Sequence, residues 1–326
     1  MGPAPAPRIN VLLVLPTNAT PPVPVILAIN FCGNHAVTDD PRVPLPTGFV
    51  YPKCKGVENA HATEVGRNAG TEAWPKHVYP LTLLLSRGYA FATFSGGDVD
   101  PDQPEIHEGV YAWLSSPEHA TATRAKQGGS LSAWAFGFHR VVDALLTIPE
   151  IDGQRIAILG HSRQGKAALW AAATDERIAL LIAHQAGMGG TAPNRGTQGE
   201  TPTILTRKYP YWFSPRYAEL GTDPVQMAYD QNALVALCAP RPVLLSNGEA
   251  DLAMNPPGQF GVLRNPEAIY RLHGVVGLGR ASAPVSGAVV GDRLGYFLRP
   301  GGHRLLPVDF MAFLDFADRH FRPATR

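Results

Sequence analysis

The chain has 326 residues, of which 45% are hydrophobic and 17% charged, and it contains 33 glycines and 31 prolines. This composition can bury a large core and is typical of one large domain with long loops. The formal net charge is +1 and no cluster of Lys and Arg stands out, so we expect neither nucleic acid nor anionic membranes as partners.

The three cysteines, Cys32, Cys54 and Cys238, form no C-x-x-C pair and leave an odd count. The sequence therefore indicates neither a zinc knuckle nor a disulfide framework, and it allows at most one bridge.

No apolar run approaches the roughly 20 residues of a membrane span. The apolar run 9–15 ends at Pro16, with no basic segment before it and no cleavage site after it, so it is predicted to be a strand. Either the protein is intracellular or its export signal lies outside this sequence.

Apolar, β-rich runs alternate with amphipathic helical segments along the chain. Strands are predicted at 8–15, 23–30, 89–94, 156–159, 178–183, 242–246 and 294–298, and helices at 78–87, 130–148, 166–173 and 308–321. The first two strands are separated by a proline-bounded turn and are predicted to pair with each other. The later alternation of strand and helix predicts a mostly parallel sheet with helices on both faces.

Two loops carry polar residues at the ends of predicted strands. The first is a long Pro/Gly loop over residues 31–74, a length usually found in functional or lid-like loops. Its Asn34 and His35 either line a site or tie the loop down. The second, residues 96–102, has alternating aspartates, but it lacks the Gly and Glu that a calcium-binding EF-hand requires at its sixth and twelfth positions. We do not expect calcium there.

The segment 156–173 is predicted to form a strand, a tight turn and a helix, with Ser162 at the apex. Such a turn would expose the hydroxyl and place the following backbone N–H groups at the start of a helix. The spacing departs from G-x-S-x-G because the second glycine, Gly165, comes one residue late. Ser162 is therefore either a nucleophile or a helix N-cap whose hydroxyl satisfies a backbone N–H.

An acid and a histidine complete the pattern further along the chain. Glu249 and Asp251 follow the strand at 242–246, and His303 lies on a glycine-flanked loop before the last helix. Serine needs a base to take its proton, and the base needs an acid to orient it. The order serine, acid, histidine, each at a strand end, is that of α/β-hydrolases. We therefore predict a three-layer α/β/α sandwich of the α/β-hydrolase fold, working without metal or cofactor.

The residues around Ser162 also resemble a known family. Gly160-His-Ser-Arg-Gln-Gly-Lys166 matches the G-x-S-R-x-G-K motif of the glucuronoyl esterases, carbohydrate esterases that hydrolyse esters between glucuronate on xylan and lignin alcohols. The resemblance is to bacterial members and covers nearly the whole chain, including Asn30-Phe-Cys-Gly-Asn-His35, Gly97-Asp-Val-Asp-Pro-Asp102, Tyr211-Trp-Phe213, Ala239-Pro-Arg-Pro242 and Arg299-Pro-Gly-Gly-His303. It implies one catalytic domain over residues 1–326, monomeric, secreted or periplasmic, that acts on a carbohydrate uronate ester. Because such relatives carry a segment before the first strand, we expect this chain to lack an N-terminal segment.

The resemblance also implies roles for individual residues. Ser162 would be the nucleophile, His303 the base, and Arg163 the donor to the oxyanion, a contribution typically of about 3 kcal/mol. Lys166 would contact hydroxyls of the uronate ring, and Trp212 would line the sugar site.

Alternative interpretations of the substrate-binding residues remain open. Lys166 is otherwise a solvated helix lysine, and Trp212 is otherwise part of the core. Glu200 is a further candidate for a sugar hydroxyl and is otherwise a surface carboxylate.

The acid is the least determined member of the predicted triad. Some relatives, notably fungal ones, place a glutamate where this chain has Gln185, which cannot carry the charge; we include its amide among the substrate-binding candidates. Other relatives use an aspartate after the later strand, which favours Asp251, with Glu249 as the alternative. Bacterial relatives read Trp-Ala-Asp-Pro where this chain reads Ala253-Met-Asn-Pro256, which predicts a changed wall of the site and a changed preference for the alcohol.

Three functions follow from these residues. The first is a serine esterase of glucuronate esters, because Arg163 and Lys166 favour a charged or hydroxyl-rich acyl group over a fatty one. The second is a related esterase of acetyl or small aryl esters. The third, suggested by Gln185 and by the changed segment 253–256, is a uronate-binding protein with a decayed site.

Overall fold

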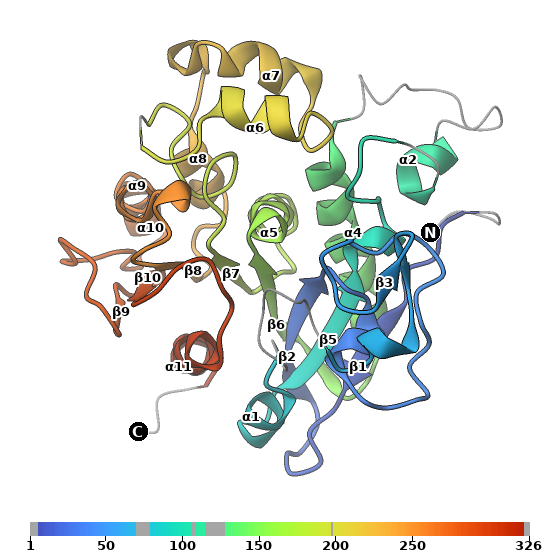
Figure 1. Cartoon of the computed structure of the whole chain (residues 1–326). Helices are drawn as coiled ribbons and strands as arrows, with labels where there is room; N and C mark the ends of the chain where they lie inside the picture. Colours follow the sequence, from blue (N-terminus) through green and yellow to red (C-terminus); the bar gives the residue numbers. More distant parts are fainter. Residues whose placement is uncertain (1–5, 70–78, 106–107, 115–127, 197, 323–326) are drawn as a thin grey trace.

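The computed structural model describes residues 6–69, 79–105, 108–114, 128–196 and 198–322. These residues are built around one eight-stranded sheet (Figure 1). The strand order is β1-β5-β2-β6-β7-β8-β10-β9. These strands are β1 (Val11–Val14), β2 (Val23–Asn30), β5 (Ala90–Ser95), β6 (Ile151–His161), β7 (Leu180–His184), β8 (Val243–Gly248), β9 (Val289–Val290) and β10 (Leu294–Arg299). A separate hairpin of β3 (Val57–Glu58) and β4 (His61–Ala62) lies in the long loop after β2.

Six neighbouring strands, from β5 to β10, are parallel, and the short strands at the two edges are antiparallel to their neighbours. The prediction that the first two strands pair was wrong: β1 pairs with β5, and β5 lies between β1 and β2. All eight residues of β2 are buried, and both of its edges are bonded to parallel strands. No edge of β2 is therefore left for β1, which lies half-exposed at the margin of the sheet.

Helices cover both faces of the sheet. The helices are α1 (Leu81–Ser86), α2 (Gly109–Leu114), α4 (Ser130–Leu145), α5 (Arg163–Thr174), α6 (Pro202–Lys208), α7 (Pro215–Gly221), α8 (Gln231–Ala236), α9 (Pro256–Val262), α10 (Glu267–Leu272) and α11 (Pro307–Phe321). One face packs against α4, α5 and α8, and the other against α1 and the aromatic face of α11. Figure 1 shows α6 and α7 side by side beyond α5 and α8. The three-layer fold expected from the alternating pattern is confirmed.

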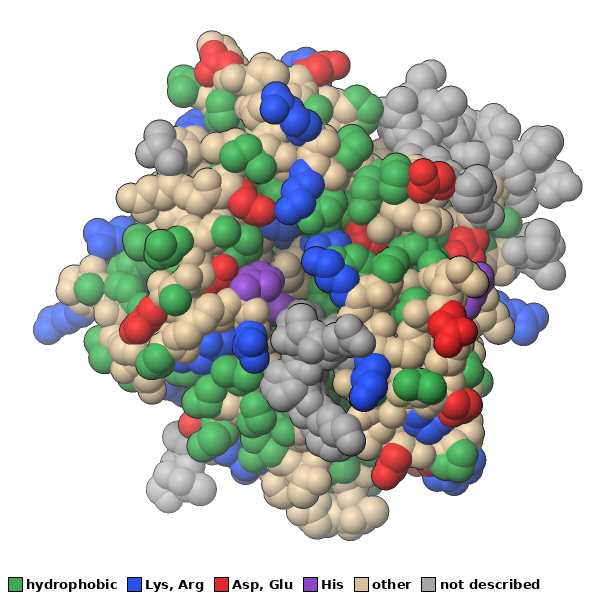
Figure 2. All heavy atoms as spheres, viewed as in Figure 1, with side chains coloured by type: hydrophobic (Ala, Val, Ile, Leu, Met, Phe, Trp, Pro, Cys, Tyr) green, Lys and Arg blue, Asp and Glu red, His purple; other side chains and the backbone are tan. Residues whose placement is uncertain are grey.

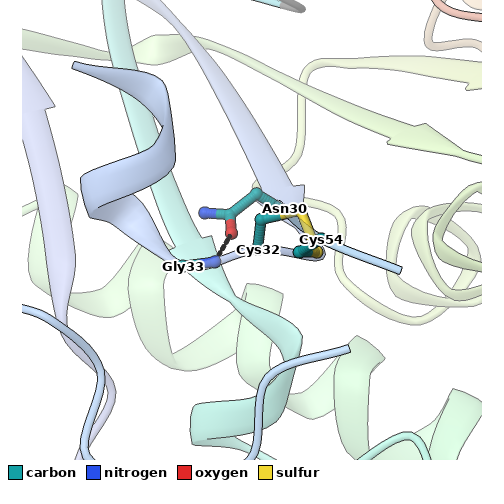
Figure 3. Close-up of a disulfide and its surroundings, with 4 residues drawn as sticks. All are labelled: Asn30, Cys32, Gly33 and Cys54. Carbon is teal, nitrogen blue, oxygen red and sulfur yellow. Dashed lines mark hydrogen bonds between the residues drawn. A yellow bond between two sulfur atoms is a disulfide. The ribbon is translucent and has the colours of Figure 1, made fainter. Parts of the chain in front are cut away.

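The long loop after β2 is held by a disulfide between Cys32 and Cys54, whose Cα atoms are 5.5 Å apart (Figure 3). Beside it, the Asn30 side chain accepts a hydrogen bond of 2.7 Å from the Gly33 N–H. The Cys32–Cys54 bridge is the single disulfide that the cysteine count allows, and Cys238 is buried and free. Residues 70–74, the end of the predicted loop, lie outside the described residues.

Asn34 and His35 begin a short 3-10 helix in this loop and are both buried. Asn34 contacts Asn30, and burial lowers the pKa of His35 to about 4. Of the two interpretations of this pair, the structure favours residues that tie down the loop.

Within the described ranges, no helix is long and apolar enough to cross a bilayer.

Candidate active site

Ser162 occupies a sharp turn between β6 and α5. Its backbone has φ 58° and ψ −129°, a conformation that costs a non-glycine residue about 1–3 kcal/mol and that is typical of functional sites. The glycines on either side permit the turn: a Cβ on Gly160 would lie 2.2 Å from the Gln164 carbonyl, and one on Gly165 would lie 2.9 Å from the Gly160 carbonyl. The late glycine is therefore needed here because the start of α5 packs closely against the end of β6.

The hydroxyl of Ser162 is not used as a helix cap. The first turn of α5 begins directly after Ser162, whose side chain makes no capping hydrogen bond. Its backbone N–H donates to the His184 carbonyl at 2.9 Å, which joins the turn to β7. The N-cap interpretation of this serine is therefore not supported, and the hydroxyl is free to serve another purpose.

His303 pairs with Asp251, both on loops that follow neighbouring strands. The Nδ1 of His303 lies 2.7 Å from Oδ2 of Asp251. The aspartate side chain is buried, whereas the histidine side chain is 34% exposed. Glu249, the alternative acid, is exposed. A carboxylate at Nδ1 fixes the tautomer in which Nε2 can accept a proton, as in serine hydrolases.

The ring of His303 lies next to the serine turn. Its centroid is 4.8 Å from that of His161, the residue directly before Ser162. On the face seen in Figure 2, a histidine borders a central hollow, with Lys and Arg side chains across it. The serine turn, the histidine loop and the acid are thus brought together from β6, β10 and β8, as the chain order predicts.

Two buried side chains hold the loop that carries His303. The Nε2 of Gln185 donates to the Gly302 carbonyl at 3.0 Å, and its Oε1 accepts from the Arg304 N–H at 2.9 Å. Arg299 donates to the Pro300 carbonyl at 2.9 Å and pairs with the buried Asp309 at 2.8 Å. Gln185 is fully buried, so in this structure its amide contacts the loop rather than open space. This differs from the sequence expectation that it contacts substrate.

The guanidinium of Arg163 is enclosed by aromatic rings. It lies 4.5 Å from the ring centroid of Trp212, 5.0 Å from that of Tyr51 and 5.2 Å from that of Tyr209. One of its nitrogens is 2.5 Å from Oδ2 of Asp102. Burial disfavours the charged form, but Asp102, together with Tyr51 and Tyr209, outweighs the effect of burial, so the pKa of Arg163 is raised. The arginine is therefore a fixed positive charge beside Ser162.

Asp102 was not predicted to be a site residue. Its Oδ1 accepts hydrogen bonds from the Trp212 indole at 2.9 Å and from the Tyr211 hydroxyl at 3.1 Å, while Oδ2 binds Arg163. The sequence signal was available, because Asp102 ends one of the motif segments and follows a buried strand. Among the described residues, no cluster of His, Cys, Asp and Glu could hold a metal ion. The aspartates of the loop at residues 96–102 contact protein groups.

Lys166 is buried on α5. Its Nζ donates to the Ala186 carbonyl and, at 2.6 Å, to the Met188 carbonyl. Burial lowers its pKa to about 8, and the charge of Glu200 opposes this shift. The interpretation of Lys166 as a solvated helix lysine is therefore wrong. An ammonium has three donors, so one N–H remains after these two bonds.

A cavity of about 510 Å³ lies beside Lys166 and Trp212. Its lining is mostly aromatic and apolar and includes Phe213, Tyr217, Leu220, Met227, Tyr229 and Leu234. Trp212 is almost fully buried and stacks on Tyr209 with centroids 3.7 Å apart, so it both packs and lines a cavity. Glu200 is half-buried, and its N–H bonds to the Ala253 carbonyl at 3.0 Å.

Comparison with known proteins identifies the family. The sequence model described as "Glucuronyl esterase, fungi" matches residues 108–274. Carbohydrate esterase MZ0003, from an unknown prokaryotic organism, is 35% identical over 316 residues, which are 97% of this chain and 72% of that protein. 4-O-methyl-glucuronoyl methylesterase 1 of Phanerochaete chrysosporium is 33% identical over 221 residues, 62% of this chain and 45% of that protein.

The solved structures agree with the sequence relatives. A promiscuous CE15 esterase from a marine bacterial metagenome superimposes with a TM-score of 0.86 and 35% identity, over 96% of this chain and 77% of that one. A glucuronoyl esterase from Solibacter usitatus has a TM-score of 0.86 and 30% identity, over 98% and 80%. The chain belongs to the glucuronoyl esterase family, carboxylic ester hydrolases with the α/β-hydrolase fold.

Proposed function

We propose that this protein is a serine esterase that hydrolyses esters of glucuronic or 4-O-methyl-glucuronic acid, such as those between xylan and lignin, through an acyl-enzyme. The observation that carries the proposal is the pair of His303 and Asp251 at 2.7 Å beside the strained turn of Ser162. The names of the relatives supply the substrate class: they include 4-O-methyl-glucuronoyl methylesterases and glucuronoyl esterases.

The proposed mechanism follows from the positions of these groups. Oγ of Ser162 attacks the ester carbonyl while Nε2 of His303 takes its proton, and Asp251 stabilises the imidazolium. The tetrahedral oxyanion is stabilised by the fixed charge of Arg163 and by the first N–H groups of α5. His303 then protonates the leaving alcohol. A water molecule, deprotonated by the same histidine, then attacks the acyl carbonyl. The bond from this carbon to Oγ of Ser162 breaks, His303 returns the proton to Oγ, and the uronic acid leaves.

The acyl side of the substrate would face Lys166. The remaining N–H of the Lys166 ammonium is a donor for ring hydroxyls, and the nearby carboxylate of Glu200 is an acceptor for them. Trp212 offers an aromatic surface. These groups suit a hydroxylated ring better than an acyl chain without oxygens.

The cellular setting is a second part of the proposal. The Cys32–Cys54 bridge supports a secreted or periplasmic protein, because disulfides persist mainly in oxidising compartments. We propose further that residues 1–326 act as one catalytic domain and as a monomer.

A panel of esters tests the activity. We expect turnover of benzyl and methyl glucuronate, weaker turnover of benzyl galacturonate, and loss of all turnover in Ser162→Ala. A folded wild-type enzyme that is inert on the glucuronates but cleaves acetylated xylan would overturn the substrate assignment. That outcome would favour an esterase of acetyl or small aryl esters, which one relative described as promiscuous also suggests.

A non-catalytic uronate-binding protein is the remaining alternative. It predicts uronate binding in a titration without covalent labelling of Ser162 by a fluorophosphonate. Mass spectrometry of the labelled protein decides, because a phosphonylated Ser162 requires an activated hydroxyl.

A further inference from the structure

The amide of Gln185 binds the backbone on both sides of His303. Its two bonds go to the carbonyl of Gly302 and to the N–H of Arg304. The side chain is fully buried, and its backbone N–H donates to the Ser246 carbonyl at 2.8 Å. An amide has one donor end and one acceptor end, so it satisfies this pair of backbone groups, whereas a carboxylate would place a negative charge against the Gly302 carbonyl.

The ring of His161 covers one face of the His303 imidazole. The planes of the His161 and His303 rings meet at 36° with centroids 4.8 Å apart, and the centroid of the His184 ring is 5.1 Å from that of His161. Nε2 of His161 is 3.1 Å from Oε1 of Gln185, which can only accept, so this nitrogen carries the hydrogen. Burial, and then the charge of His303, hold the pKa of His161 well below its usual value. A neutral ring therefore faces the imidazolium that forms during catalysis.

We propose that Gln185 and His161 are positioning residues for His303: Gln185 fixes the backbone of residues 302–304, and His161 fixes the plane of the ring. The inference rests on the proposed role of His303 as the base. With the loop and one ring face held, and Nδ1 on Asp251, the free nitrogen has a single direction, and displacement of a catalytic group by about 1 Å can cost 10²-fold in rate.

Other charged or titratable groups near His303 stay the same when these two residues are changed. They come from the loop after β8, from β7, from β10, from the loop after β10 and from α11, and include Asp251, His184, Arg299, Arg304 and Asp309. A change in the pH profile of a Gln185 or His161 variant can then be attributed to the altered contact.

The test measures how fast a fluorophosphonate labels Ser162 between pH 5 and 9, a reaction that needs the base but no particular ester. Gln185→Met removes both loop bonds at similar length. We expect its labelling rate to fall about tenfold or more, a part of the 10²–10⁴ that a general base contributes. In a His303→Ala background the same substitution should cause no further loss, because its effect passes through that residue.

Gln259→Met is the matched control. Gln259 is also fully buried, and it donates to the Asn247 side chain at 2.8 Å and to the Met254 carbonyl at 2.7 Å. Within the described part of the chain, none of its hydrogen bonds goes to residues 302–304. We expect this variant to lower the melting temperature while leaving the pH at the midpoint of the labelling profile unchanged. In Gln185→Met that midpoint should move.

The substitutions of His161 keep the inference testable if Gln185→Met does not fold. His161→Phe preserves a flat neutral ring and should label within about threefold of the wild type, whereas His161→Ala should lose about tenfold, a part of what a general base contributes. Wild-type rates in Gln185→Met or in His161→Ala, or an equal loss in the His303→Ala background, would overturn the inference. A wild-type protein that is not labelled at all would instead reject the proposed function.

Discussion

Replacing Asp251 by asparagine tests its proposed role as the acid of a catalytic triad. The substitution keeps the size of the side chain but removes the charge that faces Nδ1 of His303 at 2.7 Å. An asparagine can also present its NH₂ group to that nitrogen, which favours the tautomer with the hydrogen on Nε2. The histidine then has no lone pair with which to take the proton of Ser162.

The size of the effect follows from the geometry. With the two charges about 4 Å apart and an effective dielectric constant of about 20, the attraction between carboxylate and imidazolium is about 4 kcal/mol. This interaction forms only as His303 takes the proton, so its loss appears in kcat, and about 4 kcal/mol corresponds to about 10³-fold. The wrong tautomer adds to this loss, so about 10³–10⁴ is expected.

The assay is steady-state hydrolysis of benzyl glucuronate, with circular dichroism to verify folding. Glu249→Gln is the matched control. It removes the same negative charge from an exposed side chain that lies two residues before Asp251 in the sequence. We expect its kcat to stay within about twofold of the wild type, as is usual for exposed substitutions. If Asp251→Asn retained more than a tenth of the activity while Glu249→Gln lost it, the assignment of the acid would be wrong.

Three further predictions concern the groups around Ser162. Asp102→Asn removes the counter-charge of Arg163 and should lower kcat about 10- to 100-fold with little change in KM. This fall in kcat is smaller than the one expected when a donor to the oxyanion is removed; a wild-type kcat in steady-state assays would contradict it. Lys166, with a pKa lowered to about 8, is charged below that pH and neutral above it, so KM for glucuronate esters should rise as the pH passes 8 in the wild type; a similar rise in Lys166→Met would exclude this lysine as its cause. Ser162→Gly should abolish turnover yet raise the free energy of unfolding by about 1 kcal/mol, because glycine relieves the strain at φ 58°; a chemical denaturation curve shifted to lower denaturant would refute this.

Local patterns predicted the fold well, and the roles of the site residues stay a prediction. Strand β2 has the predicted limits, and α11 begins one residue before its predicted start. The serine turn, the histidine loop and the acid loop follow strands that run in the same direction, so their shared sheet edge could be inferred from chain order alone.

The partners of these residues were harder to predict because they depend on distances in space. Asp102 and Arg163 are 61 residues apart, and only the folded loop brings them together. The choice between Glu249 and Asp251 depends on which way a short loop turns. Gln185 appeared to be a lost acid, since nothing local indicates that its amide matches two backbone groups 117 and 119 residues further along.

The Cys32–Cys54 disulfide links two of the segments that surround Arg163, so the surroundings of this arginine depend on the redox state of the protein. Cys32 directly follows Phe31, and Cys54 comes three residues after Tyr51; both of these aromatic side chains face the guanidinium, with centroids 5.8 and 5.0 Å away. Closing a loop of this size restricts the unfolded chain by about 3–4 kcal/mol. A preparation made in a reducing host, or stored with a thiol, would therefore contain molecules in which the segments that carry Phe31 and Tyr51 are no longer joined beside Arg163, while Ser162, His303 and Asp251 are chemically intact.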